Sequence, residues 1–102
     1  MEMNLRIETN GDTVVVRING SLYVNDAAAL RMELLNYIQK GQKHFIIDLT
    51  HTDYIDSSGL GVLVAIHKRA IEHKGSVRIR GLQGVVKELF DLTRLTQVFE
   101  IL

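Results

Sequence analysis

Two adjacent serines, Ser57 and Ser58, are the side chains of this sequence that are best placed for chemistry. They follow Asp56 and stand where an apolar helix is predicted to begin. A helix N-terminus exposes unpaired N–H groups and carries about half a positive charge, so it favours an anion or a phosphate. The segment therefore indicates either a surface with two hydroxyls beside a site for an anion, or an ordinary helix cap.

Gly59 and Gly61 follow the serines within the first turns of the same predicted helix. Glycine inside a helix costs about 1 kcal/mol relative to alanine, so the two glycines make this helix less stable. Without side chains at these positions, the backbone of another protein can approach the serine hydroxyls. The glycines are also consistent with close packing of the helix on a sheet, and the sequence alone leaves both interpretations open.

A serine hydrolase is the alternative from a different functional class. Its catalytic group would combine Ser57 or Ser58 with Asp48 and with one of the four histidines, His44, His51, His67 and His73. However, the sequence lacks the Gly-x-Ser-x-Gly turn that exposes such a nucleophile. His67 and His73 are six residues apart, the wrong spacing for ligands on one helix face, and we expect both to be solvated. The sequence therefore predicts no enzyme, no catalytic residues, no metal site and no cofactor.

Composition and charge argue against several classes of partner. Twelve basic and twelve acidic residues balance, so there is no electrostatic basis for binding nucleic acid or an anionic membrane. The longest apolar run, residues 62–66, is too short to span a bilayer, and the N-terminus lacks the pattern of a signal peptide. Cysteine is absent, which excludes disulfides and thiolate metal sites. We expect a single cytoplasmic domain over residues 1–102.

The elements before the serines begin with a predicted antiparallel hairpin. Residues 3–9 and 13–20 alternate between apolar and polar side chains, and an Asn-Gly turn separates them. A helix is predicted over residues 26–40, because leucines and isoleucine recur at helical spacing and Asn25 or Asp26 can cap its start.

Alternating strands and helices are predicted for the rest of the chain. Residues 44–49 are nearly all apolar, which is typical of an interior strand covered on both faces. A loop over residues 52–58 leads into a helix over residues 57–74, whose first half is expected to be buried. The remaining predicted elements are a strand at 76–82, a helix at 84–92 and a strand at 97–102. The order ββαβαβαβ indicates an α/β fold whose sheet is mostly parallel after the hairpin.

Residues 53–64, Asp-Tyr-Ile-Asp-Ser-Ser-Gly-Leu-Gly-Val-Leu-Val, resemble the signature loop and helix of the STAS domain family. The resemblance is to the small, free-standing bacterial anti-sigma factor antagonists of that family. It extends over nearly the whole chain and includes residues 14–22, 26–40, 44–50 and 85–101. It implies one STAS domain with a mixed sheet of about five strands and helices packed mainly on one face.

The resemblance implies a protein that switches between partners. In this family, the unphosphorylated antagonist binds an anti-sigma factor, which is an ATP-dependent serine kinase, and thereby frees a sigma factor. The kinase then phosphorylates a serine of the antagonist and the complex dissociates, until a serine phosphatase restores the hydroxyl. The matching serine here is Ser57, the first serine after Asp56. The chain is expected to act as a monomer or weak dimer and to need no cofactor, because the kinase brings its own nucleotide and magnesium.

The expected partner surface combines the loop 52–58 and the first turns of the following helix with the loop 21–26. Its predicted residues are Asp53, Asp56, Ser57, Ser58, Gly59, Leu60, Gly61, Tyr23, Asn25 and Asp26. Phosphoserine adds about −1.5 to −2 charge beside two aspartates, so phosphorylation is expected to weaken binding without refolding the domain.

A second role exists within the same family. Some STAS domains are scaffolds of sensory assemblies or accessory subunits of membrane transport complexes, with no phosphorylation cycle. Tyr23 stands where family members often carry an acidic residue, and this departure leaves the second role open.

Overall fold

One mixed β-sheet forms the first layer of the computed structural model, which describes residues 4–102. The strand order is β1-β2-β3-β5-β6, and the short strand β4 pairs with the end of β2. Only the β1–β2 pair is antiparallel among the described strands. The strands are β1 (Asn4–Asn10), β2 (Thr13–Leu22), β3 (His44–Asp48), β4 (Thr52–Ile55), β5 (Ser76–Arg80) and β6 (Glu100–Ile101).

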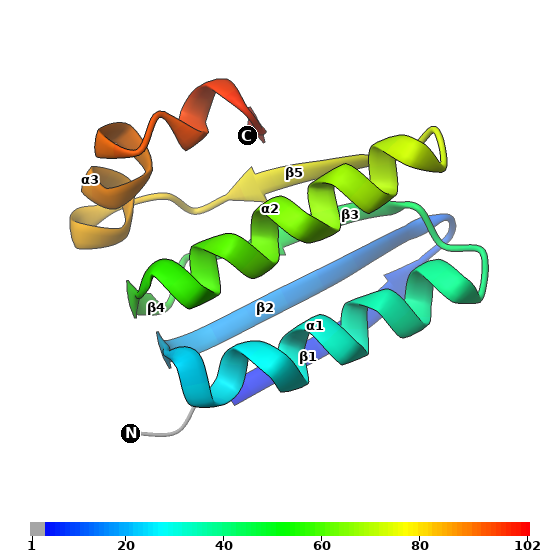
Figure 1. Ribbon diagram of the computed structural model, residues 1–102, viewed down its shortest axis with the longest axis horizontal. Helices are drawn as coiled ribbons and strands as arrows, with labels where there is room; N and C mark the ends of the chain where they lie inside the picture. The colour runs from blue at the N-terminus through cyan, green and yellow to red at the C-terminus, as the bar shows by residue number, and fades with distance from the viewer. Residues whose placement is uncertain (1–3) are drawn as a thin grey trace.

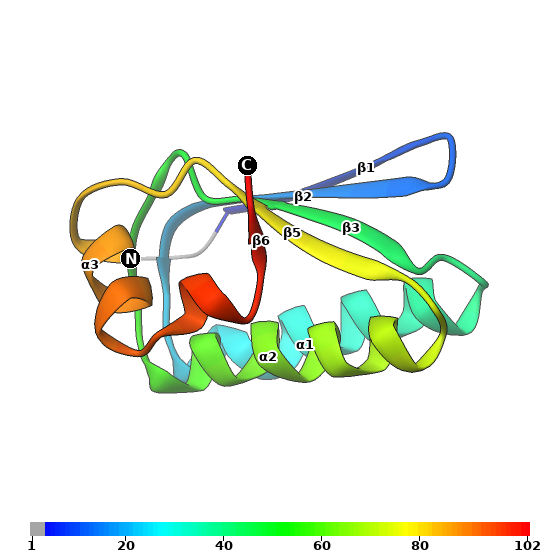
Figure 2. The ribbon, with the colours of Figure 1, turned by 90° about the horizontal axis from the view of Figure 1, so that it is seen from above.

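Helices form the second layer. Helices α1 (Val24–Gln39) and α2 (Ser57–Glu72) lie side by side along one face of the sheet, as Figures 1 and 2 show. Helix α3 (Gly84–Leu92) packs beside β4, and a 3₁₀ turn at Leu95–Gln97 leads into β6. Helix α1 connects the parallel strands β2 and β3, and α2 lies in the connection from β3 to the parallel strand β5. Because such crossovers are right-handed, both helices lie on the same side of the sheet.

The hydrophobic core lies between the sheet and the two long helices. Alternate residues of each strand point into it, because successive side chains of a strand lie on opposite faces. Complete burial of each aliphatic side chain contributes about 1.5–3 kcal/mol. The fully buried residues include Val14, Val16, Ile18, Leu30, Leu34, Phe45, Ile47, Leu63, Ile66 and Ile79.

The expected fold class is confirmed, with the helices on one face of a mixed sheet. The expectation that strand 44–49 is covered on both faces is wrong. Phe45 and Ile47 are buried, whereas Ile46 and Asp48 are only half-buried on the face that no helix of residues 4–102 covers. β3 is an interior strand in the sense that it pairs with β2 on one edge and with β5 on the other.

The structure contains one strand more than predicted. β4 lies inside the predicted loop 52–58 and pairs in parallel with β2, after a register shift between Gly20 and Ser21. It escaped prediction because it has four residues, of which only the first and last, Thr52 and Ile55, are buried. A strand with that burial pattern does not show the alternation that identifies strands in a sequence.

The bounds of most other elements agree with the patterns in the sequence. The helix predicted at 84–92 matches α3, and the helix predicted at 57–74 ends as α2 at Glu72. The first predicted strand began at residue 3, which lies outside the described residues. At the hairpin, Gly11 has a φ of 64°, the left-handed conformation that an Asn-Gly turn requires.

Candidate functional site

The carboxylate of Asp56 joins the N-termini of two helices. Its Oδ1 accepts a hydrogen bond from the N–H of Gly59 at 2.9 Å, so Asp56 is the N-cap of α2. Its Oδ2 accepts a hydrogen bond from the N–H of Val24 at 2.9 Å, in the first turn of α1. The backbone N–H of Asp56 donates to the carbonyl of Leu22 at the end of β2. These three bonds fix the loop 21–26 against the start of α2.

The start of α1 differs from the prediction. Neither Asn25 nor Asp26 is the N-cap, because the helix begins at Val24 and its N-cap is Tyr23. Asp26 lies three residues after the cap, where its carboxylate accepts a hydrogen bond from the N–H of Tyr23 at 3.4 Å. The N–H of Val24, the first donor of the helix, is bound by Asp56 from the start of α2. Asn25 is exposed.

The two serines differ in exposure. Ser57 is the first residue of α2 and is exposed, whereas Ser58 is half-buried. A modifying enzyme can therefore reach the Ser57 side chain from solvent. Asp53 is also exposed and lies on β4, the strand that leads into α2. The segment before Ser57 therefore carries two carboxylates, Asp53 and the helix cap Asp56.

The two glycines have different roles. Gly59 is buried, and a Cβ at this position would lie 2.6 Å from Cγ2 of Ile55 and 2.9 Å from Cδ2 of Leu22. The expectation that Gly59 leaves room for a partner is therefore wrong, since its missing side chain lets α2 pack against β2 and β4. Gly61 is exposed with no atom within 4 Å of a Cβ, so its surroundings are open. Leu60 is buried and belongs to the hydrophobic core.

An exposed aromatic pair lies on the two segments that lead into α1 and α2. The ring centroids of Tyr23 and Tyr54 are 5.8 Å apart, and the two residues are 41% and 38% exposed. Strand pairing brings them together, because Ser21 is the partner of Tyr54 and Leu22 the partner of Ile55. The expected proximity of loops 21–26 and 52–58 is confirmed. Tyr54 lies inside the predicted loop 52–58, but sequence reasoning did not select it as a site residue, because no local pattern distinguishes it.

The side chains considered for a hydrolase have other contacts. Asp48 accepts hydrogen bonds from the hydroxyl of Thr50 at 2.6 Å and from the guanidinium of Arg80 at 3.1 Å. Partial burial opposes ionisation of this carboxyl, but these hydrogen bonds and the charge of Arg80 outweigh it, so the pKa of Asp48 lies below its ordinary value. Asp48 therefore stabilises the uncovered face of the sheet.

His67 does not have the solvated position that was predicted for it. Its ring packs edge-on against Phe99 with centroids 5.1 Å apart, and its buried Nδ1 has no hydrogen-bond partner among the described residues. Burial lowers the pKa of His67, so the imidazole is neutral near pH 7. His73 is exposed, in agreement with the prediction. No group of three or more His, Asp or Glu side chains in residues 4–102 is arranged to hold a metal ion.

The sequence model of the STAS domain matches residues 4–102, the whole of the described chain. The chain belongs to the STAS domain family. It is 32% identical over 101 residues to the anti-sigma-B factor antagonist of Bacillus subtilis (strain 168), an alignment that covers 99% of this chain and 92% of that protein.

Solved structures of STAS proteins share the fold. An anti-sigma factor antagonist from Mycobacterium paratuberculosis has a TM-score of 0.87 at 20% identity, covering 98% of this chain and 85% of that one. The phosphorylated form of the Bacillus cell fate determinant SpoIIAA has a TM-score of 0.80 at 19% identity, covering 97% of this chain and 91% of that one. In the part of this STAS domain that the structure describes, none of the helices combines the length and the apolar character needed to cross a bilayer.

Proposed function

We propose that this STAS domain is an anti-sigma factor antagonist and that phosphorylation of Ser57 switches off its binding to an anti-sigma factor. The observation that carries the proposal is the exposed Ser57 at the first position of α2, directly after the Asp56 cap. The similarity to the anti-sigma-B factor antagonist of Bacillus subtilis over nearly the whole chain supports the assignment.

The partner is an anti-sigma factor that is also a serine kinase. It transfers the terminal phosphoryl group of ATP to the Ser57 hydroxyl. The serine oxygen forms a bond to phosphorus, the bond to the ADP oxygen breaks, and the hydroxyl proton passes to a base of the kinase. The kinase supplies the nucleotide and magnesium. A serine phosphatase hydrolyses the ester and restores the binding form, and the whole cycle takes place in the cytoplasm.

Phosphorylation acts through charge and bulk at the contact surface. The phosphate adds about −1.5 to −2 charge at a position next to Asp56 and close in sequence to Asp53. Because Ser57 is exposed, the added group needs no cavity in the core and the fold is retained. A tenfold loss of affinity for the partner requires about 1.4 kcal/mol, which repulsion and steric exclusion at one contact can supply.

The predicted partner surface consists of the exposed and half-buried members of the set: Tyr23, Asn25, Asp26, Asp53, Asp56, Ser57, Ser58 and Gly61. Gly59 and Leu60 support this surface from the core. The chain acts as a monomer or weak dimer that presents this surface to one kinase molecule.

Phosphorylation assays with matched serine variants test the proposal. Each anti-sigma factor kinase encoded in the source genome is purified and incubated with this chain and magnesium ATP, and the phosphate is located by mass spectrometry. We expect one phosphoryl group on Ser57, none on the Ser57→Ala variant, and continued modification of the Ser58→Ala variant. Phosphate on Ser58, or unchanged modification of Ser57→Ala, overturns the assignment. Stable binding without phosphorylation by any kinase favours the scaffold role instead.

A further inference from the structure

Helix α1 carries two apolar stripes, and only one of them is buried throughout. The buried stripe consists of Ala27, Leu30, Leu34 and Ile38. The second stripe consists of Val24, Ala28, Met32 and Leu35, at spacings of four, four and three residues that place them on one side of the helix. Its last member, Leu35, is half-buried and packs against the core. Val24 is 61% exposed and Met32 is 73% exposed. We call this second stripe the α1 ridge.

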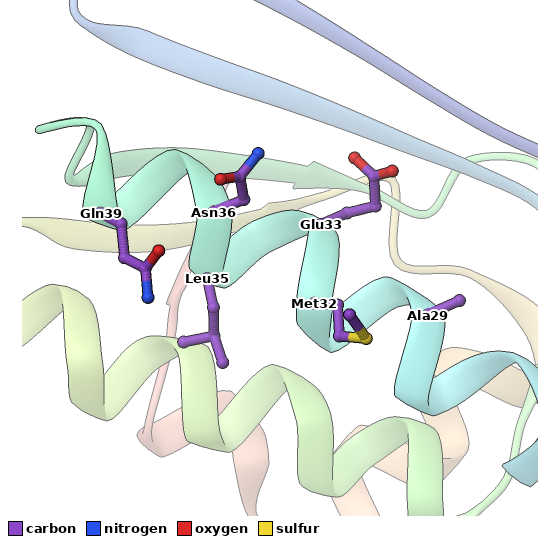
Figure 3. Close-up of a pocket in the computed structure, with 6 residues that line it drawn as sticks. All are labelled: Ala29, Met32, Glu33, Leu35, Asn36 and Gln39. Carbon is purple, nitrogen blue, oxygen red and sulfur yellow. The ribbon is translucent and has the colours of Figure 1, made fainter.

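The α1 ridge borders a groove between the two long helices. All four of its residues line this groove, together with Arg31 and with Val62 of α2, and its volume is about 530 Å³. A second depression of about 570 Å³ along α1 shares Met32 and Leu35 with it. In Figure 3, Leu35 points toward α2, whereas Glu33 and Asn36 point to the opposite side of α1. Leu35 therefore lies at the side of the groove that faces α2 (Figure 3).

The groove is continuous with the candidate functional site. Val24 is the first residue of the ridge, and its N–H is the group that Asp56 binds at 2.9 Å. The preceding residue, Tyr23, is paired with Tyr54 of β4. Tyr23, Val24 and Met32 are all exposed, so exposed side chains follow α1 from the tyrosine pair to Met32. Tyrosine and methionine are enriched at the centres of protein interfaces.

We infer that the groove along the α1 ridge receives an amphipathic helix of the same anti-sigma factor that binds at Ser57. This inference rests on the proposed function and extends the contact surface away from the phosphorylation site. A helix fits because the groove follows α1 and is bordered by Val62 of α2, so apolar side chains of a third helix can pack between the rows of side chains along α1.

The chemistry of the groove defines the partner helix. It carries apolar side chains three and four residues apart, which contact Val24, Ala28 and Met32. It also carries an acidic side chain opposite Arg31, the charged residue that lines the groove. The α1 ridge contributes affinity whether or not Ser57 is phosphorylated. The phosphate on Ser57 lowers the affinity through its negative charge.

Charge substitution in the ridge tests the inference against a matched control. Met32→Glu places a carboxylate on the ridge, and Ile71→Glu makes the same kind of change at another exposed residue, 52% accessible, about four turns beyond Ser57 on α2. Binding to the purified anti-sigma factor kinase is measured by calorimetry, and phosphorylation of Ser57 by steady-state kinetics. Circular dichroism verifies that both variants are folded.

We expect Met32→Glu to raise the dissociation constant at least about tenfold and to raise KM for phosphorylation with kcat unchanged, because Ser57 itself is unaltered. Ile71→Glu is expected to stay within about twofold of the unsubstituted chain. If Ser57 is phosphorylated normally and Met32→Glu binds with unchanged affinity, the inference is wrong and the proposed function stands.

The remaining outcomes also decide the question. Equal losses in both variants contradict a specific role of the ridge. A dimer of this chain that Met32→Glu dissociates assigns the groove to a second copy and overturns the inference. Failure of the unmodified chain to bind any anti-sigma factor of its genome overturns the proposed function and this inference together.

Discussion

Asp56 accepts a hydrogen bond from the backbone N–H of Val24 across a sequence separation of 32 residues. The same carboxylate caps its own helix through Gly59, so one side chain satisfies a donor at the start of α1 and another at the start of α2. Each of these N–H groups lacks a partner within its own helix. One carboxylate thus ties the starts of the two helices together, in addition to the pairing of β2 with β4.

Replacement of Asp56 by alanine is expected to lower the free energy of unfolding by about 2 kcal/mol, because it removes an N-cap and leaves a second N–H without its acceptor. Asp56→Asn keeps one acceptor oxygen and is expected to lose about half as much. Urea denaturation of both variants measures the difference. Equal stability of Asp56→Ala and the unsubstituted chain would show that solvent replaces both bonds at no cost.

Replacing each of the two glycines of α2 by alanine is expected to change the stability of the fold in opposite directions. Gly59→Ala is expected to destabilise the fold by about 1–3 kcal/mol, because the new methyl group would lie 2.6 Å from Ile55 and 2.9 Å from Leu22. Gly61→Ala meets no atom within 4 Å and is expected to stabilise the helix by up to about 1 kcal/mol. Thermal and urea unfolding of the two variants test both signs, and a stabilising Gly59→Ala contradicts the packing role of Gly59.

These glycines also show what the sequence can predict and what it cannot. A hairpin at Asn10 and Gly11, two long amphipathic helices and the exposed Ser57 follow from local periodicity and turn chemistry. Gly59 and Gly61 have the same local signal, and only the positions of Leu22 and Ile55 distinguish them.

Features that depend on distant contacts were not predictable. The N-cap of α1 is Tyr23 and the first N–H of the helix is bound by Asp56 from a different element, so the local sequence favours Asn25 or Asp26 incorrectly. The burial of His67 depends on Phe99, which the chain reaches only after α3. In both cases the decisive contact forms between segments that are about 30 residues apart, where local patterns carry no information.

His67 is expected to make stability depend on pH from about 7.5 downward, through the ordinary histidine pKa of about 6.5 and on to the lower pKa of the folded chain. Burial lowers the pKa of His67 in the folded chain, so below its unfolded value of about 6.5 the unfolded chain binds the proton more readily. The free energy of unfolding therefore falls as the pH decreases through this window. His67→Gln is expected to flatten the dependence, as measured by urea denaturation at a series of pH values. Asp48 has a lowered pKa and stays ionised while His67 titrates. Its contribution to the free energy of unfolding is lost only near pH 4 and below.

Modification of Ser57 is expected to change affinity without changing stability. An acidic group in the first turn of a helix is favourable by about 0.3–1 kcal/mol, and repulsion from the Asp56 cap opposes this gain. The Ser57→Asp variant and the phosphorylated chain should therefore unfold within about 1 kcal/mol of the unmodified protein. Their affinity for the anti-sigma factor should fall at least about tenfold, which corresponds to about 1.4 kcal/mol.

Ser58→Asp is the matched control, because Ser58 is half-buried and a carboxylate there must be partly desolvated. It is expected to lower the free energy of unfolding by about 1–3 kcal/mol. Urea denaturation and calorimetric titration with the anti-sigma factor, carried out on the same samples, separate the two effects. If the phosphorylated chain loses stability as Ser58→Asp does, the switch acts by disrupting the start of α2. If stability is retained while binding is lost, it acts at the contact surface, as the exposure of Ser57 requires.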